Sequence, residues 1–377
     1  MKKKSGNAFL KIMGDQRRQN LTIPLLAIVL SLLVGALIFF ALGTNPLTAY
    51  QSFLQGSGLL PKGNYAGGKS MLTDFTSFLN SWTPTVFAAL AVSVALRAGL
   101  FNIGVSGQML LGGFVASVTV GYSELSAVVA KPLVLLVAMT LGGLCGMLIG
   151  WLKYRFNINE VVSTIMANYI IQYIVSFLVS NYLIDPVSRQ SKPISANARL
   201  TLMNTSVGDL VMDIPLGVIL AVITAFALYV LLEKTIFGFH LKSVGTSPSA
   251  ASYSGMDVGK NQVLAMALSG GLAGLAGATY YLGLFHSIPP KVLSIVGFDA
   301  IAVSLLANSH PIGILFSSFL MTILSKGSTY MSSTTGLLSE IASVLTGIIL
   351  LVSACGSYGK HLLAILSDKL KQGQKEG

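Results

Sequence analysis

Long apolar runs, separated by polar, glycine-rich or charged stretches, make up most of the chain. A run of about 20 apolar residues is long enough to cross a bilayer as a helix. The pattern predicts spans at roughly 22–43, 101–121, 132–151, 160–183, 214–232, 263–284, 311–325 and 339–355. Two shorter apolar segments, at about 84–97 and 298–307, are expected to be embedded without a complete crossing. The chain is therefore expected to have about ten transmembrane or re-entrant helices.

Composition supports an all-α polytopic membrane protein. Of the 377 residues, 53% are hydrophobic and 10% are charged, whereas about a quarter of the residues of an average soluble domain are charged. We expect one transmembrane domain over 22–357, with a basic N-terminal tail at 1–21 and a C-terminal tail at 358–377. The apolar run 22–43 is longer than a signal-peptide core and no small-residue cleavage site follows it, so we expect an uncleaved first span.

The distribution of basic residues predicts the orientation. The net charge is +11, and the segments 152–159 and 233–262 and the C-terminal tail carry lysines and arginines. Cytoplasmic loops of membrane proteins carry an excess of Lys and Arg, so these segments and both termini are expected to be cytoplasmic. The loops expected outside carry some as well, balanced in part by aspartates: Lys62, Lys69, Arg189, Lys192 and Arg199 beside Asp74, Asp185, Asp209 and Asp213. The basic residues form no stripe interleaved with aromatics, which argues against a nucleic-acid partner.

The two short apolar segments lie beside similar junctions. The stretch "RAGLFNIG" begins at Arg97, and "SIVGFDAIA" begins at Ser294. Short or interrupted segments at corresponding places in two halves of a transporter indicate an internal repeat with the binding site between the halves. The sequence therefore predicts a two-half repeat with its site near these two junctions.

Amides interrupt the apolar pattern just after the first junction. The stretch "AGLFNIGVSGQMLLGGF", from Ala98 to Phe114, contains Asn102 and Gln108 among several glycines. An amide in lipid without a hydrogen-bond partner costs several kcal/mol, so both side chains are expected to face protein or a water-filled cavity. Two interpretations remain open: a tight helix junction held by amide hydrogen bonds, and a broken helix that lines a path for a neutral polar solute.

Four stretches resemble a known family when taken together and in order. They are "GLFNIGVSGQMLLGGF" (99–114), "INEVVSTIMANYI" (158–170), "VGTSPSAASYSGMDVGK" (244–260) and "GFDAIAVSLLANSHPIG" (297–313). They resemble the permease subunits of binding-protein-dependent ABC importers in the simple-sugar and nucleoside branch, and the extended first motif is closer to the nucleoside members. The chain departs from the family pattern at Ser106, where Glu is common, and at Ser252, where Arg is usual.

The resemblance implies a function and a set of partners. It implies import of nucleosides across the bacterial plasma membrane, with a separate ATPase subunit, a second homologous permease and an extracytoplasmic solute-binding lipoprotein. ATP would be bound by the partner and this chain would hold no cofactor, which agrees with the lack of a G-x-x-x-x-G-K-[ST] pattern and of a clustered metal or catalytic motif. The same machine carrying a simple sugar such as ribose or galactose is the first alternative. An ion-coupled secondary transporter is less favoured because intramembrane charges are few, and a channel or a structural membrane protein would need no ATPase.

The segment 244–258 is the expected contact with the ATPase. Thr246 or Ser247 before Pro248 is typical of a helix start, so the sequence predicts a short helix there. The resemblance implies that this helix couples the permease to the ATPase, whereas an ordinary cytoplasmic turn is the simpler alternative. The residues assigned to coupling are Gly245, Thr246, Ser247, Pro248, Ala250, Ala251 and Tyr253.

Several other side chains are candidates for the substrate path. Asp299 is the deepest ionisable group in the apolar pattern; it either lines the path or caps the short segment. Phe101 and Phe298 flank the two junctions and either stack a nucleobase or simply pack. The candidate path residues are Phe101, Asn102, Gln108, Asn168, Gln172, Phe298 and Asp299.

Overall fold

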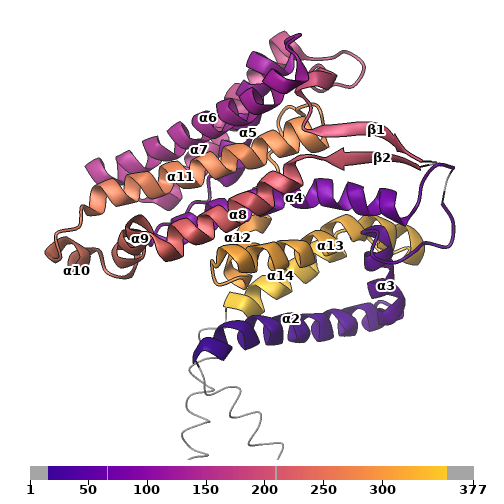
Figure 1. The fold of residues 1–377 in the computed structure, drawn as a ribbon. Helices are drawn as coiled ribbons and strands as arrows, with labels where there is room; N and C mark the ends of the chain where they lie inside the picture. The colour runs from indigo at the N-terminus through magenta and orange to yellow at the C-terminus, as the bar shows by residue number, and fades with distance from the viewer. Residues whose placement is uncertain (1–15, 66, 209, 355–377) are drawn as a thin grey trace, which may run out of the picture.

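The computed structural model describes residues 16–354 except 66 and 209. The predicted tail 358–377 and most of the predicted tail 1–21 lie outside the described residues. The described chain is a bundle of helices with one β-hairpin at its end (Figure 1).

The helices and strands follow the apolar pattern closely. They are α2 (Gln16–Ala41), α3 (Pro46–Gly56), α4 (Met71–Arg97), α5 (Val105–Ala116), α6 (Ala127–Phe156), α7 (Glu160–Leu178), β1 (Thr201–Val207), β2 (Leu210–Pro215), α8 (Gly217–Lys234), α9 (Ile236–Thr246), α10 (Pro248–Tyr253), α11 (Val258–Ala278), α12 (Val296–Leu306), α13 (Pro311–Thr335) and α14 (Ile341–Ala354). Short π-helical turns extend α5 to Gly121, α7 to Leu183 and α11 to Leu284.

Helix length and composition confirm a polytopic membrane protein. Among the described residues, six helices are long and apolar enough to span a membrane: α4, α6, α7, α8, α11 and α13, with α7 and α11 counted together with their π-helical turns. The pair α2 and α3 is bent by 114° at its break, and 105–121, α12 and α14 are shorter apolar helices. The strictly all-α expectation is wrong in one respect, because β1 and β2 pair antiparallel in the predicted polar loop 184–213 and just beyond it.

The prediction of a short embedded segment at 84–97 is also wrong, because these residues form the second half of the long helix α4. The first half of α4 is polar in sequence, yet its polar groups bond within the protein: Thr83 Oγ1 donates to the Leu79 carbonyl of the same helix at 2.9 Å, and the indole Nε1 of Trp82 donates to Ser318 Oγ of α13 at 2.8 Å. A hydropathy pattern does not register polar groups that are satisfied by neighbouring helices. The short helix of the first half is instead α5.

The packing of helices has a two-half pattern. The central pair α4 and α11 are in contact; α5 packs on α11 as α12 packs on α4. In the same way α6 packs on α11 and α7 on α5, while α13 packs on α4 and α14 on α12. Each helix from α4 to α7 thus has a counterpart from α11 to α14 with corresponding neighbours, which is the arrangement that an internal repeat would produce.

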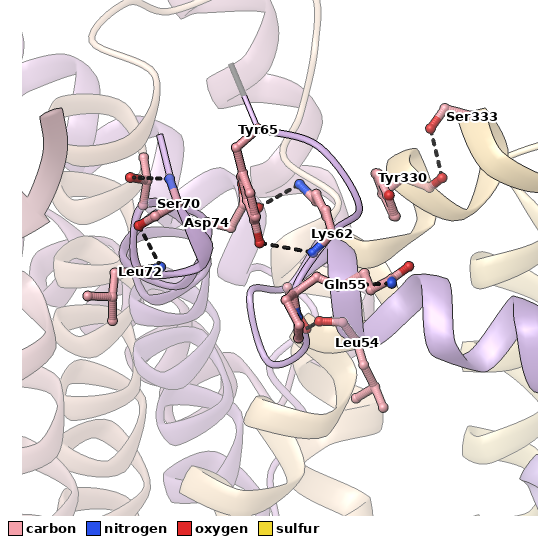
Figure 2. A network of polar contacts seen from close by, with 12 residues as sticks. Leu54, Gln55, Lys62, Tyr65, Ser70, Leu72, Asp74, Tyr330 and Ser333 are labelled. Atoms are coloured by element: carbon pink, nitrogen blue, oxygen red, sulfur yellow. Dashed lines mark hydrogen bonds and ion pairs between the residues drawn. The ribbon is translucent and has the colours of Figure 1, made fainter. Parts of the chain in front are cut away.

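The two ends of the bundle differ in structure. The β-hairpin lies at one end, and α9 and α10 lie at the other, where α2 begins and α14 ends (Figure 1). At the hairpin end the segment between α3 and α4 is held against two helices. Lys62 Nζ lies 2.7 Å from Asp74 Oδ2 of α4 and 4.6 Å from the ring centroid of Tyr330 of α13 (Figure 2). The Gly68 carbonyl also accepts the N–H of Val211 at 3.0 Å, which joins this segment to β2.

Candidate functional site

Asn102 lies at the centre of a buried hydrogen-bond network after α4. Its Nδ2 donates to Gln108 Oε1 at 2.9 Å and to Ser269 Oγ of α11 at 2.8 Å, and its Oδ1 accepts the N–H of Gly104 at 2.9 Å. Ser269 Oγ in turn donates to the Ala91 carbonyl of α4 at 2.6 Å. A single side chain therefore ties the 98–104 loop to α5 and, through Ser269, to both central helices.

The polar side chains of α7 hold the two junctions. Asn168 Oδ1 accepts the N–H of Gly107 at 2.8 Å, and its Nδ2 donates to the Ile103 carbonyl at 3.0 Å. One turn further, Gln172 Nε2 donates to the Lys291 carbonyl at 2.7 Å, in the segment before α12. The polar face predicted on this helix exists, and its two amides contact different loops.

The two junctions noted in the sequence meet in space. Ser106 Oγ of α5 donates to the Ser294 carbonyl before α12 at 2.8 Å. A Cβ on Gly297 would stand 2.3 Å from the same Ser106 oxygen, so only glycine allows α12 to approach α5 this closely. A hydroxyl at position 106 is short enough to fit this contact.

The structure favours the helix-junction interpretation for the amides in this conformation. Asn102 is 1% exposed and Gln108 is fully buried, and neither lines a cavity identified in the described chain. Gln108 Nε2 is buried without a hydrogen-bond partner among the described residues. Phe101 is half-buried and Phe298 is 42% exposed. Substrate contact by these four side chains stays a prediction.

A cavity of about 270 Å³ lies between α12, α13 and α14, with Thr85 of α4 in its wall. It is lined mainly by hydroxyls: Thr322, Ser325, Ser328 and Thr329 of α13, and Ser339, Ser343 and Thr346 at the start and along α14. Two carboxyl groups, Asp299 and Glu340, also line it. The lining includes no Lys, Arg or His, so the cavity disfavours an anionic solute and offers many hydrogen-bonding groups.

Asp299 is the one sequence candidate that lines this cavity. The alternative that Asp299 caps α12 is wrong, because Ile295 is the N-cap and Asp299 lies in the first turn. The Val296 N–H is instead accepted by Ser294 Oγ at 3.2 Å. Asp299 is therefore not needed to cap the N-terminus of α12.

The hydroxyl-bearing residues that line this cavity were not predicted from the sequence, although their spacing indicates that they share a helix face. Thr322, Ser325 and Thr329 recur at helical spacing on one face of α13, and Ser339, Ser343 and Thr346 repeat this spacing at and after the start of α14. Ending the predicted span at residue 325 separated Ser325 from Thr329. The three-dimensional contact of α12, α13 and α14 is what gathers the two stripes.

The predicted coupling segment contains a short helix. Ser247, not Thr246, is its N-cap, and Ser247 Oγ accepts the N–H of Ala250 at 3.4 Å. Pro248 is the first residue of α10. Ala251 is 3% exposed and packs inward, whereas Tyr253 is 94% exposed. Gly245 and Thr246 belong to the last turn of α9.

Charged groups join the helix ends beside this segment. Arg97 forms an ion pair with Glu233 of α8, and its Nε donates to the Ser309 carbonyl at 2.9 Å. Glu233 also pairs with Lys242 of α9. The C-terminal end of α4 is thereby connected to α8, α9 and the turn between α12 and α13. Among the described residues, no group of three or more His, Cys, Asp or Glu side chains could hold a metal ion.

Comparisons with known proteins give one family and several close relatives. Residues 75–354 match the family described as the permease component of the branched-chain amino acid transport system. The chain is 31% identical over 367 residues to the nucleoside ABC transporter permease protein NupB of Lactococcus lactis subsp. cremoris (strain MG1363), covering 95% of this chain and 96% of that protein. It is 34% identical over 359 residues to the guanosine ABC transporter permease protein NupP of Bacillus subtilis (strain 168), covering 95% and 98%.

A third relative is named for a different substrate. The glucose ABC transporter permease protein TsgB13 of Haloferax volcanii is 26% identical over 350 residues, covering 90% of this chain and 88% of that protein. No solved structure matches this chain.

Proposed function

This chain belongs to the branched-chain amino acid transport system permease family, and on that premise we propose that it is the permease subunit of an ABC importer for nucleosides. The family expected from the four motifs is thereby confirmed, and the chain is a multi-pass protein of the plasma membrane. The observation that carries the nucleoside assignment is similarity over nearly the whole chain to NupB and NupP.

The chemistry of the α12–α14 cavity supports a nucleoside over a branched-chain amino acid. An amino acid presents a carboxylate that needs a cationic or N–H partner and an aliphatic side chain that needs an apolar pocket. The cavity has hydroxyls and carboxyls, together with the apolar side chains of Ile295, Val296 and Met321, but no cationic side chain that could pair with a carboxylate. A nucleoside is uncharged and carries sugar hydroxyls, which these groups can bind.

A second permease subunit would close the cavity. Ser325, Thr329 and Ser343 are exposed in the isolated chain, and hydroxyls and carboxyls facing lipid would lose their hydrogen-bonding partners. We infer that a homologous subunit covers this face of α12, α13 and α14, so that the substrate path runs between two permeases. The two-half packing pattern supports the internal repeat that the sequence predicts.

The two ends of the bundle suit different partners. Lys234, His240, Lys242 and Lys260 lie at or near α9 and α10, which supports a cytoplasmic location for this end and for both termini. There α10, with Tyr253 exposed, would dock on the ATPase subunit. At the opposite end the β-hairpin and the segment 57–70 between α3 and α4 would bind the solute-binding lipoprotein.

Transport would proceed by alternating access driven from outside this chain. ATP binding and hydrolysis in the ATPase would move α10 and α9, and the movement would pass to the end of α4 through the contacts of Arg97 and Glu233. The chain itself would bind and release the nucleoside without covalent chemistry.

The test is uptake of labelled nucleosides by cells with and without this gene. ATP is depleted in one arm and the proton gradient is collapsed in another. Uptake that requires the gene, follows ATP and survives collapse of the gradient is the expected result. Uptake that follows the gradient would overturn the proposal and favour a secondary transporter.

A simple sugar is the second candidate, favoured by the relative TsgB13 and by the hydroxyl lining of the cavity. Competition distinguishes the two cargoes. Excess unlabelled ribose, galactose or glucose should leave nucleoside uptake unchanged, and competition by a sugar at matched concentration would favour the sugar assignment.

A further inference from the structure

We propose that the Asp299 carboxylate binds the vicinal 2′- and 3′-hydroxyls of a ribose, and so makes the cavity between α12, α13 and α14 selective for ribonucleosides over deoxyribonucleosides. This inference rests on the proposed nucleoside function and adds the part of the substrate that is recognised and the residue that recognises it.

Asp299 has a free carboxylate at the wall of this cavity. It is half-buried in the first turn of α12, and among the described residues its side chain makes no hydrogen bond or ion pair. Removing a carboxylate from water without a partner is costly. Ser294 Oγ accepts the Val296 N–H, and within the described chain no backbone N–H at the start of α12 donates to Asp299, so the carboxylate is available to a ligand in the cavity.

The backbone that carries Asp299 is held firmly on two sides. Ser106 Oγ bonds the Ser294 carbonyl at 2.8 Å, and Gly297 lies against Ser106. Further along α12, the Val303 carbonyl accepts a hydrogen bond from Ser317 Oγ of α13 at 2.9 Å. A binding group on a rigid element recognises a ligand more precisely than one on a loop.

A carboxylate matches a vicinal diol in number and polarity. Its two oxygens only accept hydrogen bonds, and each hydroxyl of the diol can donate one. Hydrogen bonds to an ionised group are about twice as strong as those between neutral groups. A ligand without one of the two hydroxyls leaves a carboxylate oxygen without its partner in a partly closed site.

The other walls of the cavity offer groups for the rest of the ligand. The hydroxyls of Ser325, Thr329, Ser343 and Thr346 make no hydrogen bond among the described residues, whereas Thr322 Oγ1 bonds the Ser318 carbonyl at 2.8 Å. Free hydroxyls both donate and accept, so they can contact the 5′-hydroxyl or the polar edge of a base. The volume of about 270 Å³ is close to the lower end of the range of roughly 300–1,000 Å³ for small-molecule sites, which fits one nucleoside-sized ligand.

The test uses the complete importer, with its ATPase, second permease and binding protein, reconstituted in proteoliposomes. Initial uptake rates are measured for one ribonucleoside and for its 2′-deoxy and 3′-deoxy forms. The readout is the ratio of the ribonucleoside rate to each deoxynucleoside rate. The same binding protein is used throughout, so its own selectivity cancels when the ratio of a variant is compared with that of the wild type. Asp299→Asn is the test variant, and Glu124→Gln, which removes an exposed carboxylate outside the cavity, is its control.

The expected result is a wild-type preference for the ribonucleoside, with both deoxy forms slower. Asp299→Asn should lower ribonucleoside uptake at least about tenfold and bring the two ratios toward one, while Glu124→Gln should keep the wild-type ratios. Wild-type ratios in an assembled Asp299→Asn importer, or an equal loss of preference in Glu124→Gln, would overturn the inference.

Two further outcomes are distinguished by design. If Asp299→Asn does not assemble, Asp299→Glu keeps the charge but moves the carboxylate by one methylene, and the inference predicts a lower ratio; an unchanged ratio would overturn it. If the wild-type importer transports no nucleoside at all, the proposed function fails, and this is seen before any variant is compared.

Discussion

Gly99 and Gly245 lie backbone against backbone. Gly99, two residues after the end of α4, has a φ of +70°, and a Cβ on it would stand 2.9 Å from the Cα of Gly245. A Cβ on Gly245 would stand 2.3 Å from the carbonyl oxygen of Arg97. Because no side chain separates the two segments, movement of α9 acts directly on the loop that carries Asn102.

This contact predicts the effect of adding one methyl group. Gly245→Ala would force the backbones apart, and overpacking of this kind costs about 1–3 kcal/mol. We expect uptake to fall at least severalfold and the purified permease to melt at a lower temperature. Gly143→Ala is the control, since Gly143 is likewise helical and the added Cβ would have its nearest atom, the Ala267 carbonyl oxygen, at an ordinary contact distance of 3.4 Å. Equal uptake in the two variants would argue against a role of the Gly99–Gly245 contact in transport.

The Asn102 network predicts a loss of stability. Asn102→Ala removes two donated hydrogen bonds and leaves the Gly104 N–H without its acceptor in a buried site. Each unsatisfied buried group costs about 1–3 kcal/mol, so we expect less permease in the membrane and a lower melting temperature. The measurement is thermal unfolding in detergent beside uptake per assembled complex. Normal stability with reduced uptake would instead support direct contact of Asn102 with the substrate.

His310 predicts a dependence of stability on pH. Its Nδ1 accepts the N–H of Gly313 at 3.4 Å as the N-cap of α13, and burial, together with nearby Arg97, lowers its pKa below the ordinary value of 6.5. Folding therefore favours neutral histidine. The resulting stability is complete above pH 6.5 and is lost as the pH falls through the lowered pKa.

The variant His310→Asn isolates this contribution. Asparagine is a good N-cap and does not titrate, so α13 should remain capped at every pH. We expect the melting temperature of the wild type to fall relative to that of His310→Asn on acidification below about pH 6.5. Parallel curves for the two proteins would show that His310 contributes nothing to the pH dependence.

Because Tyr253 is exposed, a substitution there should affect binding of the ATPase without affecting the stability of the permease. Tyr253 is 94% exposed on α10, whereas Ala251 is buried beneath it. Tyr253→Asp should change the free energy of unfolding of the permease by no more than about 0.5 kcal/mol, as is usual for surface substitutions, but reduce co-purification of the ATPase and abolish uptake. Val187→Asp, at a residue that is 91% exposed in the loop after α7 and its π-helical turn, is the control. Full ATPase recovery with Tyr253→Asp would show that α10 is not the docking helix.

The sequence by itself determined the class of the protein and most of its helices. A run of about 20 predominantly apolar residues is a local property of the sequence, so the spans at α6, α7, α8 and α11 follow from hydropathy alone. The junction at Asn102 and the helix start at Ser247 and Pro248 were also visible, because caps, glycines and isolated amides act within a few residues along the chain.

Only the tertiary structure decided which polar groups are satisfied and which are free. Asn102, Gln108 and Asn168 look like a path in the sequence, but all three are buried. Asn102 bonds Gln108 of α5 and Ser269 of α11. Asn168 bonds the backbone of Ile103 and Gly107. The polar half of α4 is a full helix because neighbouring helices cover it. The stripes on α13 and α14 become a cavity around Asp299 only when the two helices pack beside α12. Hydrogen-bond satisfaction depends on groups distant in the chain, and this is why hydropathy predicts the spans but not the site.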